Sequence, residues 1–250
     1  MGPRGGGRDD CLVAGGAPVA ARRLTWAPGR PTVLLGVATL ALVCFYYLAR
    51  ADAVGVYSRP RGWFALTGAP LAPPLHFAAS ALLLAVIPVL AAWRLAGLTP
   101  RDLGLGLGRW RAGLVWLAVG LPLAILAGRI AALAPAIRAV YPLDPTLAAE
   151  PRAFIRYAAL QFLYFGSWEV LFRGVLLFGL RAPLGAASSN VVQTALSVTA
   201  HFGRAINETL AAAPAGIVFG AIDLRIGSIW YVALLHWVVG VSMDWFILTT

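Results

Sequence analysis

The chain has 250 residues, of which 60% are hydrophobic and only 12% are charged, and its mean hydropathy is +0.79. Soluble domains carry about 25% charged residues, so this composition excludes an ordinary soluble globule and predicts a protein surrounded by lipid. It also excludes a disordered chain, a collagen and a disulfide-stapled secreted scaffold, because the apolar content is high and there are only two cysteines. These cysteines, Cys11 and Cys44, indicate neither a disulfide nor a metal site.

The net charge of +10 comes from 20 basic residues, all of them arginine, against 10 carboxylates. Most arginines stand singly or in pairs at the ends of apolar runs, where a membrane protein meets lipid headgroups. They do not form a stripe with interleaved aromatic residues, as a nucleic-acid surface would require. We therefore expect the lipid bilayer as a partner, and no nucleic acid.

The first part of the chain predicts a tail followed by three membrane spans. Residues 1–30 are rich in Gly, Pro and Arg and have no signal-peptide layout, so we expect a flexible cytoplasmic tail. Residues 31–135 contain apolar runs of about the length that a bilayer requires, and we place three transmembrane helices there. Their expected ranges are 31–49, 75–93, with a kink at Pro88, and 112–128.

A basic, glycine-rich segment joins the second and third spans. Gly104, Gly106 and Gly108 do not have the spacing of a dinucleotide-binding loop, and no strand precedes them. Arg101 and Arg109 flank these glycines, so the segment is interpreted as an interfacial loop at the lipid headgroups.

The second half, residues 153–250, differs because polar residues enter its apolar runs. Helices are expected there at about 153–180, 185–201, 206–224 and 228–248. The complete chain is thus predicted to be an all-α, polytopic transmembrane helical bundle with about seven spans.

The arginines also indicate an orientation. If the tail is cytoplasmic, eleven arginines fall on the cytoplasmic side and seven on the other, which favours a cytoplasmic N-terminus. Arginine without lysine, together with abundant alanine and glycine, is typical of a GC-rich bacterial genome. The predicted location is therefore the cell membrane, as a multi-pass protein of a bacterial inner or plasma membrane.

Four ionisable residues lie inside apolar runs of the second half, where each costs about 2.5 to 3.5 kcal/mol even on lenient insertion scales. Glu169 and Arg173 are four residues apart and can pair on one helix face. That pair alone can equally be an internal ion pair without a function. His201 and His236 follow on later helices, and a lone helical histidine is more often a packing residue than a ligand.

The arrangement of these residues is more informative than any one of them. Three consecutive late spans place Glu169, His201 and His236 at comparable depth. A convergent set of this kind can bind a metal or polarise a water molecule.

The same residues resemble the motifs of the CPBP intramembrane proteases, which include the type II CAAX-prenyl endopeptidases and the bacteriocin-processing or immunity proteins of the ABI family. The family pattern is a double glutamate followed by arginine, an aromatic residue before a histidine, and a last histidine followed by asparagine or aspartate. The resemblance covers about residues 153–245. The chain departs from the pattern at three positions, which are Trp168, Ser197 and Gly240.

A variant branch of the family has a similar Trp-Glu beginning, and this resemblance adds Glu208 and Asp244 as possible site residues. Gly203 can break the helix after His201 and let the Glu208 carboxylate turn back. Asp244 lies eight residues beyond His236, about 12 Å along a helix, so both cannot ligate one metal, and Asp244 can equally be a polar residue near the outer interface.

The resemblance implies an intramembrane endopeptidase that hydrolyses membrane-associated or leader-type peptides. In the implied mechanism Glu169 and His201 deprotonate a water molecule, His236 stabilises the oxyanion, and Arg173 holds Glu169 in place. Zinc held by Glu169, His201 and His236 is one option for a cofactor, and no cofactor is the other, which is favoured because Arg173 opposes a nearby dication.

Two other functions stay open at this point. Trp168 and Gly240 fit a catalytically inactive relative that acts as a membrane chaperone or an immunity-type binding protein. An ion or small-solute transporter is a third reading, although such proteins usually show internal repeats, and none is visible here.

Overall fold

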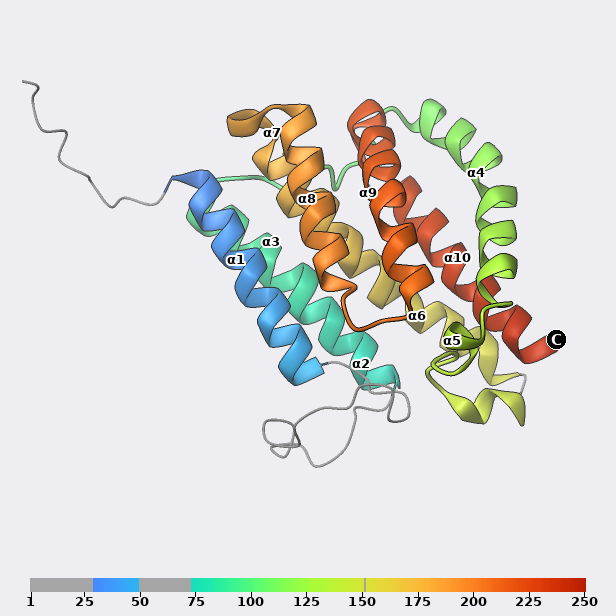
Figure 1. Cartoon of the computed structure of the whole chain (residues 1–250). Coiled ribbons are helices and arrows are strands. Elements are labelled where there is room, and N and C mark those ends of the chain that lie inside the picture. Colours follow the sequence, from blue (N-terminus) through green and yellow to red (C-terminus); the bar gives the residue numbers. More distant parts are fainter. Residues whose placement is uncertain (1–28, 50–72, 151) are drawn as a thin grey trace, which may run out of the picture.

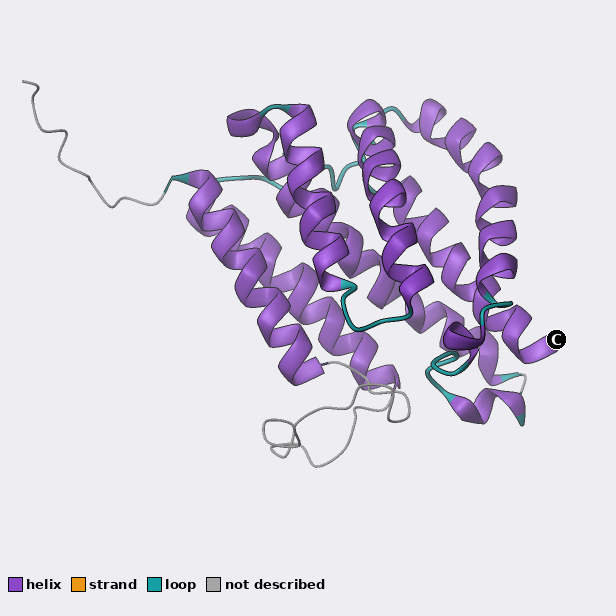
Figure 2. Ribbon diagram, viewed as in Figure 1, coloured by secondary structure: helices purple, strands orange, loops and turns teal. Residues whose placement is uncertain are grey.

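The computed structural model describes residues 29–49, 73–150 and 152–250. In this part of the chain the regular elements are all helical and no strand occurs (Figures 1 and 2). The predicted tail of residues 1–30 lies outside the described residues except for its last two.

The first three long helices fall where the apolar runs predict them. The first comprises α1 (Arg30–Cys44) and the π-helical η1 (Phe45–Ala49). The second comprises α2 (Pro73–Ser80), the π-helical η3 (Ala81–Val86) and α3 (Ile87–Ala96), and the third is α4 (Trp110–Ala131). Pro88 cannot donate a backbone hydrogen bond to the preceding turn, and the π-helical turn of η3 lies directly before it.

The linker before the second half contains the short α5 (Pro135–Arg138) and the 3₁₀ turn η4 (Pro145–Ala148). A continuous helix of 32 residues follows, made of α6 (Ala153–Glu169), the π-helical η5 (Val170–Phe178) and α7 (Gly179–Leu184). The chain ends with α8 (Ala186–Ala200), α9 (Ile206–Ile226) and α10 (Trp230–Thr249).

Six helices of the described residues are long and apolar enough to cross a membrane. Their ranges are Arg30–Ala49, Pro73–Ala96, Trp110–Ala131, Ala153–Leu184, Ile206–Ile226 and Trp230–Thr249. The other predicted span is α8, a helix of only 15 residues. The predicted all-α, polytopic bundle is confirmed.

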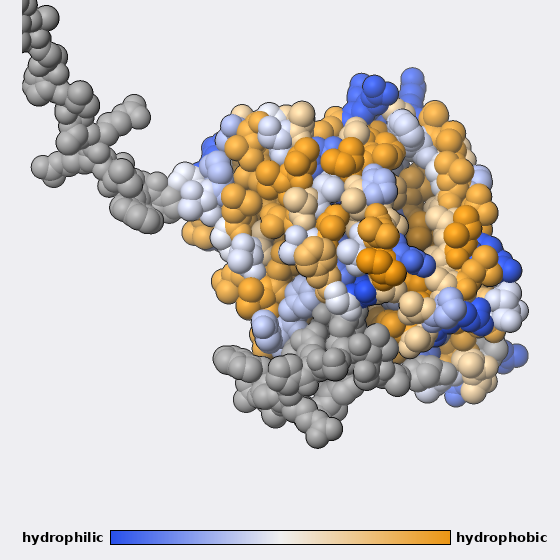
Figure 3. Space-filling view, in the orientation of Figure 1, coloured by the Kyte–Doolittle hydropathy of each residue, from blue (hydrophilic) through white to orange (hydrophobic). Residues whose placement is uncertain are grey.

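The helix Ala153–Leu184 forms the centre of the bundle. In its most apolar stretch 83% of the residues are buried inside the protein, whereas the corresponding share is 11% to 33% in the other five. The outer helices instead turn large apolar side chains outward, and apolar residues cover most of the face shown in Figure 3. Since lipid is the solvent for this surface, the central helix is the one that water and lipid reach least.

Glycines allow two helix pairs to approach closely. A Cβ atom at Gly216 or Gly220 of α9 would lie 2.7 or 2.0 Å from side-chain atoms of Thr194 and Asn190 on α8. On α4, Gly113 packs in the same way against Tyr231 of α10. Small residues at such contacts are a common basis of helix association in membranes.

The predicted interfacial loop connects α3 to α4 and closes one end of the bundle. Its backbone is hydrogen-bonded to the turn between α9 and α10, because Arg109 N donates to Ile226 O at 2.8 Å and Ile229 N donates to Gly104 O at 3.1 Å. The loop therefore fixes the end of the bundle at which α10 begins (Figure 1).

Candidate functional site

Glu169 lies at the centre of the bundle, at the junction of α6 and η5. Its side chain is 0% exposed, and that of Arg173, one turn further along, is 3% exposed. Arg173 Nε lies 3.2 Å from Glu169 Oε2, so the ion pair predicted from the spacing is present. The helix is π-helical from Val170 to Phe178, and π-helical turns inside α-helices are frequent at functional sites.

His236 of α10 contacts the other oxygen of this glutamate. Its Nδ1 lies 2.6 Å from Glu169 Oε1, and its side chain is 24% exposed. Because Glu169 occupies Nδ1, Nε2 is the ring nitrogen that remains for a water molecule or a substrate. Glu169 thus joins Arg173 on its own helix to His236 on another, and the imidazole is the most accessible part of the group.

Phe165 explains one departure from the family pattern. Its ring packs edge-on against His236 with 4.8 Å between the ring centroids. A Cβ atom at Gly240, one turn after His236, would lie 2.3 Å from Phe165 Cζ. Gly240 therefore makes room for the aromatic ring that supports the histidine, and an asparagine there would require the ring to move. Phe165 could not be recognised from the sequence, because nothing in its apolar run indicates which helix its side chain faces.

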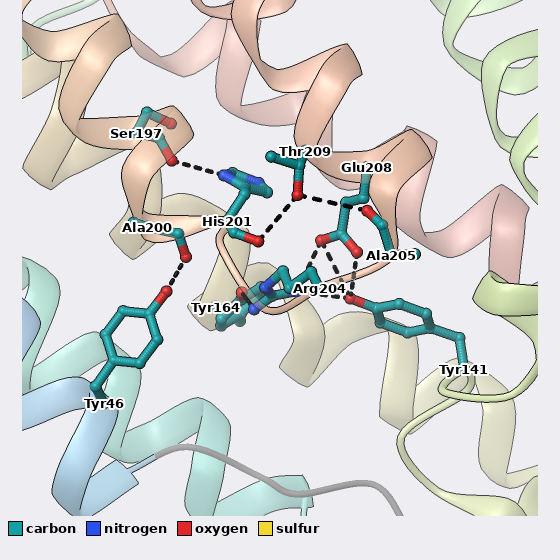
Figure 4. A network of polar contacts seen from close by, with 10 residues as sticks. All are labelled: Tyr46, Tyr141, Tyr164, Ser197, Ala200, His201, Arg204, Ala205, Glu208 and Thr209. Carbon is teal, nitrogen blue, oxygen red and sulfur yellow. Dashed lines mark hydrogen bonds and ion pairs between the residues drawn. The ribbon is translucent and has the colours of Figure 1, made fainter. Parts of the chain in front are cut away.

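His201 lies at the end of α8 and contacts the site through an aromatic ring. Its Nδ1 donates to the Ser197 carbonyl oxygen at 2.7 Å, and its ring is edge-on to Trp168 at 5.2 Å between centroids. Tyr46 donates to the Ala200 carbonyl oxygen beside it (Figure 4). Since Trp168 precedes Glu169 directly, the tryptophan that replaces a family glutamate forms the packing link between His201 and the site.

Glu208 belongs to a separate polar network around Arg204 (Figure 4). Arg204 Nη1 lies 2.8 Å from Glu208 Oε1 and 2.7 Å from the Tyr141 hydroxyl, while Nη2 donates to the Tyr164 hydroxyl at 2.6 Å. Burial raises the pKa of Tyr141 well above its usual value, so this hydroxyl keeps its proton and can donate to Glu208. Arg204 balances the charge of Glu208 locally, and no hydrogen bond or ion pair joins Glu208 to Glu169 among the described residues.

The helix break predicted after His201 is present, because Gly203 has a φ of +83°. The chain turns there and α9 begins at Ile206, which places Glu208 in the first turn of α9. The turn brings the Glu208 carboxylate back to Arg204 and not to the ion pair of η5.

Asp244 lies in a third polar group, eight residues along α10 from His236. It is 0% exposed, so its side chain lies inside the bundle and not on the bundle surface. Its Oδ2 accepts hydrogen bonds from Gln161 Nε2 at 2.8 Å and from the Tyr157 hydroxyl at 3.1 Å, both on α6. Asp244 therefore joins α6 to α10 at a distance from Glu169.

Asp223 of α9 is a buried carboxylate that the sequence analysis missed. It is 0% exposed, and neither of its oxygens accepts a hydrogen bond from the described residues. Its position in the apolar run GIVFGAIDL was the available signal, since an ionisable residue within a span is a functional candidate by default.

The predicted zinc ligands do not form a metal site in the described part of the chain. No three His, Cys, Asp or Glu side chains lie there in an arrangement that could hold a metal ion. Glu169 and His236 pair with each other, while the Nδ1 of His201 is taken by a carbonyl of its own helix.

Comparison with known proteins supports the resemblance found in the sequence. Residues 152–242 match the family model described as type II CAAX prenyl endopeptidase Rce1-like. The match includes Glu169, Arg173, His201, Asp223 and His236 and excludes Asp244. Neither a curated protein nor a solved structure matches the chain.

Proposed function

We propose that the chain is an intramembrane endopeptidase, because residues 152–242 match the type II CAAX prenyl endopeptidase Rce1-like family model and six helices of the described residues are long and apolar enough to cross a membrane. It hydrolyses peptide bonds of membrane-associated or leader-type peptides. The contact between Glu169 and His236 carries the proposal, because an imidazole held by a buried carboxylate is a recurring element of acid–base catalysis.

The direction of the hydrogen bonds assigns a role to each histidine. The Ser197 carbonyl can only accept, so His201 Nδ1 carries the proton and its Nε2 keeps a lone pair. His201 is thus suited to take a proton from the attacking water. The Glu169 carboxylate stabilises the protonated form of His236, whose Nε2–H can then donate to the oxyanion.

This assignment changes the part of Glu169 in the expected mechanism. The sequence suggested that Glu169 acts on water directly together with His201, but its side chain is fully buried and its Oε1 is engaged by His236. Glu169 instead orients His236 and balances its charge, while Arg173 holds the other carboxylate oxygen. After attack on the carbonyl carbon, the proton on His201 passes to the leaving amine. None of these steps uses a metal.

Replacing Glu169 by Gln tests the proposal. The amide keeps the size of the side chain but removes the charge that supports His236, so cleavage should fall by about 10² to 10⁴-fold. The measurement compares the membrane proteomes of cells that make wild-type or Glu169→Gln protein and searches for new amino- or carboxy-terminal ends. New ends found only with the wild type support an enzyme. A metal chelator added to isolated membranes should not prevent these ends from forming.

Equal cleavage by the Glu169→Gln variant would overturn the mechanism. If the wild-type protein itself yields no new ends, the chain is not a protease, and an inactive relative that binds a partner would be the better description. Equal amounts of both proteins in the membrane are the required control.

We also propose that the N-terminus is cytoplasmic, in the cell membrane of a bacterium, because the arginine-rich loop between α3 and α4 then lies inside. Single cysteines introduced into a chain without its two native ones test this orientation. Arg101→Cys in the loop should react with an impermeant thiol reagent only in inverted vesicles, and Glu150→Cys before α6 only in intact cells. Both positions are exposed in the structure, and the reverse pattern would refute the orientation.

A further inference from the structure

The side chain of His201 lies beside the site but makes no hydrogen bond to the helix that carries Glu169, among the described residues. Its imidazole donates to the Ser197 carbonyl oxygen of its own helix, and its ring contacts α6 only through Trp168. The turn that follows contains Gly203, with a φ of +83°. Because glycine permits many backbone conformations, contacts from outside the turn have to determine where the histidine lies.

Arg204 joins this turn to α6 (Figure 4). Its backbone N–H donates to the His201 carbonyl oxygen at 3.0 Å, and its Nη2 donates to the Tyr164 hydroxyl at 2.6 Å. A guanidinium is a planar fork of donors, so this bond restricts the direction in which the turn meets α6 as well as its distance. Since Arg204 is only 13% exposed, water competes little for its donors.

Tyr164 connects this hydrogen bond to the site. It lies one helical turn before Trp168, with 6.0 Å between the two ring centroids, and Trp168 directly precedes Glu169. The turn after α8 is therefore joined to α6 at two successive helical turns, once through the ring of His201 and once through the guanidinium of Arg204. Two such contacts define an orientation that one pair of rings does not.

The other contacts of Arg204 lead to other elements. Its Nη1 lies 2.8 Å from Glu208 Oε1 on α9 and donates at 2.7 Å to the hydroxyl of Tyr141, which belongs to the linker before α6. Glu208 balances the charge of the guanidinium, so the bond to Tyr164 is not needed for that purpose. The two tyrosine hydroxyls thus form a matched pair, of which only one leads to the helix of Glu169.

We propose that Arg204 is a positioning residue that binds the Tyr164 hydroxyl and thereby holds the His201 imidazole against Trp168, the residue before Glu169. Arg204 acts through His201 and touches no reacting atom. The inference rests on the proposed protease function, since it assigns a task to a residue that supports the proposed base of that reaction.

The test compares Tyr164→Phe with Tyr141→Phe, which each remove one hydroxyl that accepts from Arg204 and keep the ring. It uses the full chain reconstituted in liposomes and a synthetic peptide that spans a segment cleaved only by the wild type in cells. Tyr164→Phe should lower kcat per folded molecule about tenfold and change KM by less than about twofold, because the base is misplaced and the contacts with substrate remain. Tyr141→Phe should keep kcat within about twofold. Equal kcat values in the two variants would overturn the inference.

A combined variant shows whether Tyr164 acts through Arg204. Arg204→Gln is made together with Glu208→Gln, so that no carboxylate is left without its cation. Adding Tyr164→Phe to this pair should not slow cleavage further, since residues of one unit are not additive. Multiplied losses would mean that Tyr164 acts by another route and would overturn the inference.

Hydrogen exchange of the backbone amides of residues 201–205 tests the positioning without the reaction. Tyr164→Phe releases the turn from α6, so these amides should exchange at least about threefold faster than in the wild type. Unchanged exchange would overturn the inference, and so would a loss of folded protein that accounts for the whole loss of cleavage. If Glu169→Gln is inactive but Tyr164→Phe is fully active, only this inference fails. If Glu169→Gln is active, the proposed function itself fails.

Discussion

The helices α6 and α10 carry two buried carboxyl groups whose hydrogen-bond and ion-pair partners differ. At one end of their contact, Asp244 accepts hydrogen bonds from the neutral side chains of Tyr157 and Gln161. At the other group, Glu169 is held by Arg173 and by His236. Both groups keep buried polar atoms without a hydrogen bond in the described structure, among them Asp244 Oδ1 and Arg173 Nη1. The same two helices thus contain one group with neutral donors and one with ionisable partners.

This difference in partners indicates that one group stabilises the helix pair and that the other can take part in proton transfer. Neutral donors that converge on one buried carboxylate fix the distance between two helices. A carboxylate between an arginine and a histidine has, in addition, an imidazole beside it, the side-chain group that serves most often in acid–base catalysis. We interpret the Asp244 group as the one that stabilises the packing of α6 against α10, and the Glu169 group as the reactive one.

Asp244→Ala should produce the largest effect on stability. It leaves the donors of Tyr157 and Gln161 unsatisfied in a buried position, and we expect a loss of about 2 to 3 kcal/mol in the free energy of unfolding. Cleavage per folded molecule should stay near the wild-type value, in contrast to Glu169→Gln. The measurement is reversible unfolding in mixed micelles together with an activity assay on the folded fraction. A loss of activity without a loss of stability would place Asp244 in the reactive group and would contradict the separate roles of the two carboxyl groups.

Gly240→Ala should have an intermediate effect. The new methyl group would meet the Phe165 ring, so the ring has to shift away from His236, at a cost of about 1 to 2 kcal/mol. Phe165→Leu in the same chain makes room and should recover most of this loss. A Gly240→Ala protein as stable as the wild type, measured in the same micelles, would show that Phe165 does not define the space beside His236.

The helices could be predicted from the sequence much better than the contacts of the site. All seven expected segments are helical, because an apolar run of bilayer length leaves the backbone no other way to satisfy its hydrogen bonds. The pairing of Glu169 with Arg173 followed from their spacing. The contact with His236 depends on how α6 and α10 are rotated against each other, and the π-helical turn after Glu169 changes that rotation locally.

Two further features of the site could not be predicted, because they depend on contacts between residues that are far apart in the sequence. The neutralisation of Glu208 requires Tyr141, from the linker before α6, to meet Arg204 after α8. The space that Phe165 occupies requires a glycine on a helix that is distant in sequence. In both cases the residues looked ordinary in their own segments.

Glu208→Gln should have the smallest effect, although the resemblance to the variant branch made Glu208 a possible site residue. The ion pair with Arg204 is only partly buried, with exposed fractions of 13% for Arg204 and 23% for Glu208, so its loss should cost less than about 1 kcal/mol. Glutamine keeps an oxygen for Arg204 and for Tyr141, and cleavage should therefore change by less than about threefold, which corresponds to less than about 1 kcal/mol. If cleavage fell as far as it is expected to fall in Glu169→Gln, the Arg204–Glu208 ion pair of Figure 4 would belong to the reacting residues, which would then include a residue of α9.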